Sequence, residues 1–138
     1  MTTTETQFRT AEVARLADVS LRQLQMWEEK RIAIASRERR VRRYSVSQAL
    51  FVMVLAELLR RRGLSSQRLR RLSVVVRQAL SDHGVHSGRC AFLLTDGKNV
   101  QFANSQNQTC EIVSNFSKPI LCVNVSACLD RIKKNQFV

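Results

Sequence analysis

No apolar run in this 138-residue sequence is long enough to cross a membrane. The longest run spans residues 49–56 and ends at Glu57, whereas a membrane-spanning helix needs about 20 apolar residues. We also expect no secretory leader, because residues 1–7 are polar and no apolar segment follows them. We therefore expect a cytoplasmic protein that has no membrane partner.

The sequence also lacks the patterns that indicate enzyme chemistry. It has no nucleophile beside a base, no carboxylate pair with catalytic spacing and no glycine-rich loop of the kind that cradles phosphates. We expect no catalytic residues, no cofactor and no enzyme activity.

Paired cysteine spacing is missing as well, since the four cysteines lie at positions 90, 110, 122 and 128. His83 and His86 lie near Cys90, but a zinc site needs a fourth ligand, so we expect no metal site. The later cysteines have apolar neighbours and are expected to be small core residues. Disulfides are rare in the cytosol. A cysteine-based redox or metal sensor is the alternative.

Acidic residues are scarce relative to basic ones. The chain has 11 Asp and Glu against 23 Lys and Arg, a net charge of +12 and an isoelectric point near 11.0. Residues 1–80 hold 17 of the basic residues and 7 of the acidic ones, and 18 of the 23 basic residues are arginine. Arginine binds phosphate through a planar fork, so nucleic acid is the favoured partner over a membrane surface or plain solvation. Single-stranded RNA is disfavoured, because only Trp27 and Tyr44 are available as stacking platforms.

The first part of the chain predicts two short helices joined by a tight turn. Thr10 can cap a helix that runs to Ala17, and residues 18–19 make the turn. Ser20 then opens a second helix, with Gln23 at the position of a capping box. This arrangement is typical of a helix-turn-helix.

A basic hairpin and two longer helices are expected next. Residues 31–35 read as a strand, residues 36–38 as a turn and residues 39–44 as a very basic return strand, which together form the wing of a winged helix. Ser45 and Gln48 form a second capping box that opens a helix to Arg62. This helix is apolar nearly all round, so it must be covered on several sides. Either this helix or the strand expected at 120–125 should lie at the interface of a homodimer. A further helix opens at Ser65 or Ser66 and ends near Leu80, with the buried stripe Leu69, Leu72, Val76 and Ala79.

The composition changes near residue 81, where arginine becomes rare. Residues 81–89 read as a linker. Beyond it we expect strands at 90–95 and 100–103, a helix opened by Ser105, a strand at 120–125 and a helix at 127–134. A core of this size is marginal by itself, so this β-β-α-β-α module is expected to pack on the first part or on a second copy.

Residues 8–80 resemble the DNA-binding domain of the MerR family of bacterial transcription regulators. The resemblance is carried by the segment from Thr10 to Ser20, by Leu24 and Trp27-Glu28, by Arg42-Arg43-Tyr44-Ser45 and by Leu58 to Ser65. Gln25 and Met26 stand where the family usually has an arginine and an aromatic residue. The resemblance implies a winged helix-turn-helix whose second helix enters the major groove of DNA and whose basic turn before Tyr44 contacts phosphates.

These observations combine into one expectation. The fold is mainly α with small β: a flexible tail (1–7), a winged helix-turn-helix domain (8–80), a linker (81–89) and a small α+β domain (90–138) for dimerisation or signal reception. The function is that of a sequence-specific regulator of transcription, active as a homodimer on double-stranded DNA at the nucleoid, with room for a protein partner at the second domain. The alternative is an architectural or adaptor protein that assists recombination, replication or segregation. The expected DNA contacts are Ser20, Leu21, Arg22, Gln23, Gln25, Trp27, Arg39, Arg40, Arg42, Arg43 and Tyr44.

Overall fold

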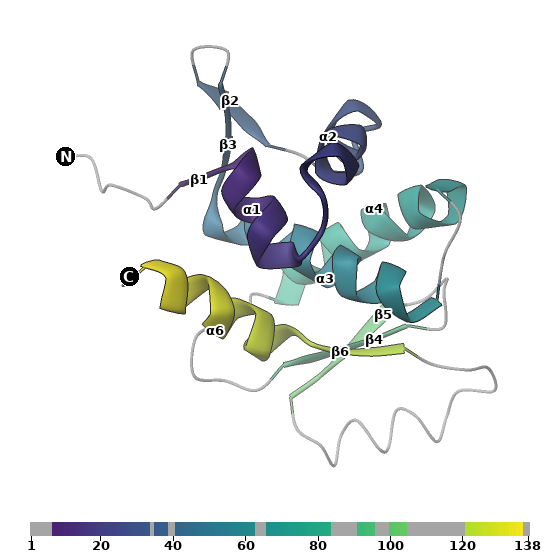
Figure 1. Ribbon diagram of the computed structural model, residues 1–138. Helices are drawn as coiled ribbons and strands as arrows, with labels where there is room; N and C mark the ends of the chain where they lie inside the picture. Colours follow the sequence, from purple (N-terminus) through teal and green to yellow (C-terminus); the bar gives the residue numbers. More distant parts are fainter. Residues whose placement is uncertain are drawn as a thin grey trace.

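The computed structural model describes residues 7–33, 35–38, 41–62, 66–83, 91–95, 100–104 and 121–136. Helices dominate these residues, and two small antiparallel sheets accompany them (Figure 1). The elements in chain order are β1 (Phe8–Arg9), α1 (Thr10–Ala17), α2 (Leu21–Glu29), β2 (Ser36–Glu38), β3 (Val41–Tyr44), α3 (Val46–Arg62), α4 (Ser66–His83), β4 (Phe92–Thr95), β5 (Val100–Ala103), β6 (Leu121–Asn124) and α6 (Val125–Gln136).

Helices α1 and α2 are joined by the predicted tight turn. Asp18 adopts a left-handed conformation with φ 55° and ψ 47°, which ends α1. Ser20 caps α2, because its hydroxyl oxygen accepts the backbone N–H of Gln23 at 3.0 Å. The expected cap at Thr10 is wrong: Thr10 is the first residue of α1, and its hydroxyl instead donates to Glu28 on α2.

The basic hairpin is present, but its first strand lies later than predicted. Strand β2 occupies residues 36–38, which were expected to be the turn, and pairs with β3 in the three-stranded order β1-β3-β2. Arg31 has a positive φ of 58°, and the backbone N–H groups of Ile32 and Ala33 both donate to the carbonyl of Trp27. The side chains of Ile32 and Ala33 are both buried. The segment 31–33 therefore packs into the core at the end of α2 and is not available as a strand.

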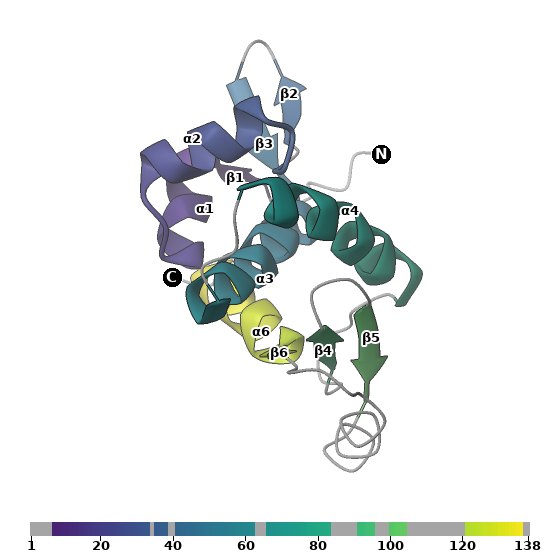
Figure 2. The same cartoon turned by 90° about the vertical axis from the view of Figure 1, so that its right-hand side faces the viewer.

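Helix α3 is the centre of the molecule. Its predicted capping box is confirmed, since the N–H of Ser45 donates to Gln48 Oε1 at 2.8 Å and the N–H of Gln48 donates to Ser45 Oγ at 3.2 Å. Every residue from 49 to 56 is buried. The cover comes from α1, β3, α4, β6 and α6 of the same chain (Figure 2). This internal cover removes the reason for placing α3 at a dimer interface.

The later part of the chain packs directly on α3. Strands β4, β5 and β6 form an antiparallel sheet in the order β5-β4-β6, with Leu93 opposite both Phe102 and Val123. Helix α6 lies along α3, and its Leu129 and Ile132 join the same buried cluster as Val13 and Leu24. The helix expected to open at Ser105 lies outside the described residues. One continuous core therefore includes apolar side chains from both ends of the chain.

Helix α4 carries its predicted stripe inward and continues beyond its predicted end. Leu69, Leu72 and Val76 are buried, whereas Ala79 is half-buried. The helix continues to His83, so the first three residues of the expected linker are helical. None of the described helices is long and apolar enough to span a membrane.

Candidate nucleic-acid interface

Helix α2 presents a polar outer face that begins at its first turn. Leu21, Arg22 and Gln25 are exposed, whereas Leu24 and Trp27 are buried against the core. A helical period of 3.6 residues separates these two faces. Arg22 is a forked donor that matches the acceptors on a guanine edge, and the Gln25 amide matches the donor and acceptor of an adenine edge.

Trp27 does not belong to this outer face. Its side chain is only 1% exposed and is part of the main hydrophobic cluster. The expectation that Trp27 contacts DNA is therefore corrected, because the indole holds α2 onto the core. Gln23 is half-buried, and Ser20 is exposed at the helix cap.

A buried carboxylate, Glu28, connects α2 to the two neighbouring elements. Its Oε2 atom accepts the Thr10 hydroxyl from α1 at 3.1 Å and the Tyr44 hydroxyl from β3 at 2.7 Å, while its Oε1 atom accepts Arg42 Nη1 from β3 at 3.0 Å. The Glu28 side chain is 3% exposed. A buried charge is tolerated where it is paired and hydrogen-bonded, and these three donors satisfy both requirements. We call Glu28, Thr10, Arg42 and Tyr44 the Glu28 cluster.

Tyr44 is 0% exposed, so its expected contact with a phosphate is also corrected. Burial, together with its hydrogen bond to the Glu28 carboxylate, raises the pKa of Tyr44 well above its usual value. The phenol therefore stays protonated and donates to Glu28. Glu28 was not among the expected functional residues, although it follows Leu24 by four residues and so falls on the buried stripe of α2.

The arginines of the hairpin divide into different roles. Arg42 has 31% of its side chain exposed and forms an ion pair with Glu28. Arg43 is half-buried on the paired strand β3, opposite Ser36 and Arg9. Arg39 and Arg40, both expected contacts, lie outside the described residues.

Other arginines bind backbone carbonyls within the molecule. Arg60 on α3 donates to the carbonyls of Ala17 and Asp18, and Arg131 on α6 donates to the carbonyl of Leu16 at 2.6 Å. Cations at the end of a helix satisfy its last carbonyls and offset its dipole. The turn between α1 and α2 is thus held by two distant helices.

Arg77 of α4 supports the segment after α2. Its guanidinium lies 4.9 Å from the centre of the Phe51 ring and donates to the Ile32 carbonyl at 3.1 Å. Burial lowers the pKa of Arg77. Because Arg60, Arg77 and Arg131 each bond to a backbone carbonyl of the same chain, the net charge overstates the number of arginines that are fully available to an anionic partner.

No three potential metal ligands come together in the part of the chain that the structure describes. The side chains of His83, His86 and Cys90 lie outside the described residues. Cys128 is a buried core residue, and burial raises the pKa of its thiol to about 11. A thiol with a raised pKa is a weak nucleophile at neutral pH.

Comparison with known proteins agrees with this geometry. The family model described as MerR HTH family regulatory protein matches residues 8–73, a segment that runs from β1 into α4 and includes the outer face of α2 and the Glu28 cluster. No match to the chain was found among curated proteins. Residues 8–73, just under half of the chain, therefore match the MerR family of helix-turn-helix regulators, and this match supports a MerR-type DNA-binding domain.

Proposed function

We propose that this protein is a transcription regulator that recognises a specific site on double-stranded DNA with a winged helix-turn-helix. In this proposal α2 enters the major groove and the β2–β3 hairpin is the wing, which lies along the sugar-phosphate backbone. The family match supports DNA binding as the general activity.

The observation that carries the proposal is the two-sided construction of α2. Arg22 and Gln25 are exposed on one side, and Leu24, Trp27 and Glu28 fasten the other side to the core and the hairpin. A recognition element binds more tightly when its supporting contacts hold it in place before the ligand arrives. The buried side of α2 is therefore part of the proposed DNA-binding site, because it positions the exposed side, although it does not itself contact DNA.

Phosphate contacts are assigned to the hairpin. Arg43 is the described arginine best suited to this role, and Arg39 and Arg40, which lie between β2 and β3 in the sequence, are proposed to share it. Arg42 is given a positioning role, since its guanidinium is already bonded to Glu28. Phosphate contacts orient the protein on DNA and carry no sequence information directly.

A symmetric homodimer would place two such domains on two half-sites. Of the two interfaces suggested by the sequence, α3 is covered by its own chain, so the strand β6 is the one we retain. It lies at the edge of the described β5-β4-β6 sheet. In this proposal residues 90–138 serve dimerisation or reception of a signal, while residues 8–80 bind DNA.

The test is a pull-down of genomic fragments at physiological salt, followed by footprinting of the enriched sequences. A discrete site near a promoter supports the regulator, and an Arg22→Ala variant should lose the enrichment of that site. Dispersed or clustered sites without a shared sequence would favour the architectural or adaptor role. Salt is held constant between samples because phosphate contacts make the affinity depend strongly on it.

A further inference from the structure

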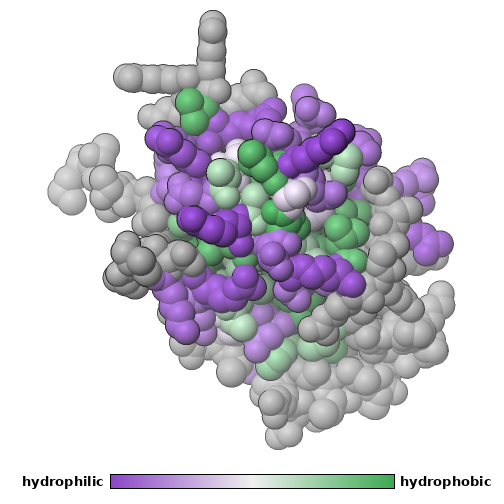
Figure 3. All heavy atoms as spheres, viewed as in Figure 1, coloured by the Kyte–Doolittle hydropathy of each residue, from purple (hydrophilic) through white to green (hydrophobic). Residues whose placement is uncertain are grey.

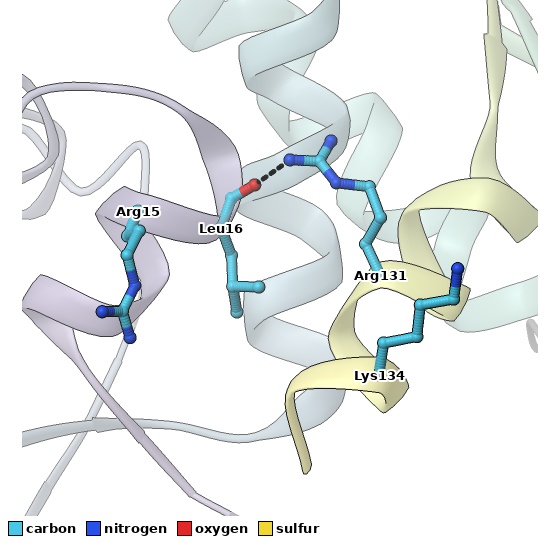
Figure 4. A pocket seen from close by; sticks show the side chains of 4 residues that line it. All are labelled: Arg15, Leu16, Arg131 and Lys134. Atoms are coloured by element: carbon cyan, nitrogen blue, oxygen red, sulfur yellow. Dashed lines mark hydrogen bonds between the residues drawn. The ribbon is translucent and has the colours of Figure 1, made fainter. Parts of the chain in front are cut away.

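A basic pocket lies where α1 meets α6 (Figure 4). Its lining consists of Arg15 and Leu16 from α1 and of Arg131 and Lys134 from α6. Three of these four residues carry a positive charge, and no carboxylate is among them. The pocket is therefore a concave surface of one charge sign, built by two helices more than 100 residues apart in the sequence.

The cations of this pocket are placed differently. All three cations are exposed, and Arg131, unlike Arg15 and Lys134, is also oriented by a bond to the Leu16 carbonyl. Neither Arg15 nor Lys134 takes part in an ion pair with another described residue. The close-up shows Arg15 on one side of Leu16 and both Arg131 and Lys134 on the other, with the Arg131 guanidinium bonded to the Leu16 carbonyl (Figure 4). Hydrophilic side chains dominate the described surface on this face of the molecule, and apolar ones are scattered between them (Figure 3).

Gathering like charges in a concave site has an electrostatic consequence. A cleft lined by one charge sign raises the local concentration of ions of the opposite sign. Arginine forks match carboxylate and phosphate oxygens, and lysine adds a point charge. The carbonyl end of α1 would by itself repel an anion, but Arg131 and Arg60 cover its last carbonyls.

We propose that this pocket binds a small anion that bears a phosphate or carboxylate group and so ties α6 to α1. The anion comes from solution and is not a phosphate of bound DNA. In both ribbon views α6 lies on the other side of α1 and α3 from the β2–β3 hairpin (Figures 1 and 2). A DNA duplex on α2 and the hairpin would lie away from α6.

The test uses the full-length protein and inorganic phosphate as the probe, with acetate as a carboxylate probe. Binding is followed by NMR shift titration at constant ionic strength, in a buffer otherwise free of phosphate. Phosphate is expected to bind saturably, and Arg15→Gln and Lys134→Gln should each weaken it by about threefold to tenfold. Lys133→Gln is the matched control, because it removes the same charge from the same helix at a residue that does not line the pocket.

Two results would overturn the proposal. The first is an equal loss of phosphate affinity in all three variants, which would mean that only the overall charge matters. The second is no saturable binding of phosphate or acetate, together with a loss of DNA affinity in Arg15→Gln, which would make the pocket a contact for the DNA backbone. Retained DNA affinity of Arg15→Gln in phosphate-free buffer is the result expected for a solution anion.

Discussion

The Tyr44 hydroxyl donates a 2.7 Å hydrogen bond to Oε2 of Glu28, and this bond joins β3 of the hairpin to the inner side of α2. This bond therefore connects α2, which we propose contacts bases, to the hairpin, which we propose contacts phosphates. The same carboxylate also accepts from Thr10 and Arg42, so its loss would loosen three elements at once.

The first prediction concerns this bond. Tyr44→Phe keeps the ring in the core but leaves Glu28 with one donor fewer, so the free energy of unfolding should fall by about 1–3 kcal/mol. Urea denaturation measures this change. Glu57→Gln is the control, because its partner Arg60 is partly exposed and exposed pairs contribute about 0–1 kcal/mol. An unchanged stability of Tyr44→Phe would mean that the Glu28 cluster does not hold the hairpin.

The second prediction distinguishes base contacts made by α2 from phosphate contacts made by the hairpin. Arg22→Ala should cost roughly 1–3 kcal/mol of binding on the preferred site and less on random DNA. Arg43→Ala should weaken binding to both DNAs alike and lower the salt slope by about one unit. Fluorescence anisotropy over a range of salt concentrations distinguishes the two outcomes.

Arg71→Ala serves as the matched control for this pair, since Arg71 is an exposed arginine on α4 outside the proposed interface. If Arg22→Ala leaves the site preference unchanged, then α2 does not read bases and Arg22 is an ordinary surface residue.

The third prediction concerns alkaline pH. Burial raises the pKa of Cys128 from 9.0 to about 11, so the folded state holds this proton more tightly than the unfolded state does. The stabilisation is complete below pH 9.0 and is lost as the pH rises toward the folded value. The loss should reach about 1 kcal/mol near pH 10.

Cys128→Ala should flatten this pH dependence between about pH 9 and pH 11, the window set by the two pKa values. Its buried neighbour Leu129 provides the control, because Leu129→Ala should lower the unfolding free energy by a similar amount at every pH. A Cys128→Ala variant with the wild-type slope would show that this thiol does not titrate as expected.

DNA affinity should also be independent of reductant and zinc. A tenfold change in DNA affinity with either would favour a cysteine-based redox or metal sensor.

The fourth prediction concerns the oligomer. The chain has a mass of 15.8 kDa, and sedimentation at micromolar concentration should reveal a species of twice this mass. A Val123→Asp change would not test the interface, because Val123 is a buried core residue. Asn124→Asp, at the exposed end of β6, should instead weaken a dimer formed through this strand by adding a negative charge, and its carboxylate can still accept the backbone N–H of Ala127 at the start of α6. A monomer with and without DNA would exclude the dimer.

Several elements could be predicted because their signals are local. Ser45 and Gln48 are three residues apart and bond to each other's backbone, so the start of α3 is specified within one helical turn. The spacing of Leu69, Leu72 and Val76 likewise identifies the inner face of α4 without reference to its neighbours. The ordered motifs of residues 8–80 were sufficient to suggest a MerR-like domain, and the family match over residues 8–73 supports it.

Tertiary structure alone decided which polar residues are available to a partner. Tyr44 and Trp27 looked like DNA contacts, yet one is bonded to Glu28 sixteen residues away and the other lies in the core. Arg131 binds a carbonyl 115 residues away, and Arg77 binds one 45 residues away. A local pattern cannot specify such pairs, because they form only when the core brings distant segments together, and the cost of burying a charge then selects the partner that satisfies it.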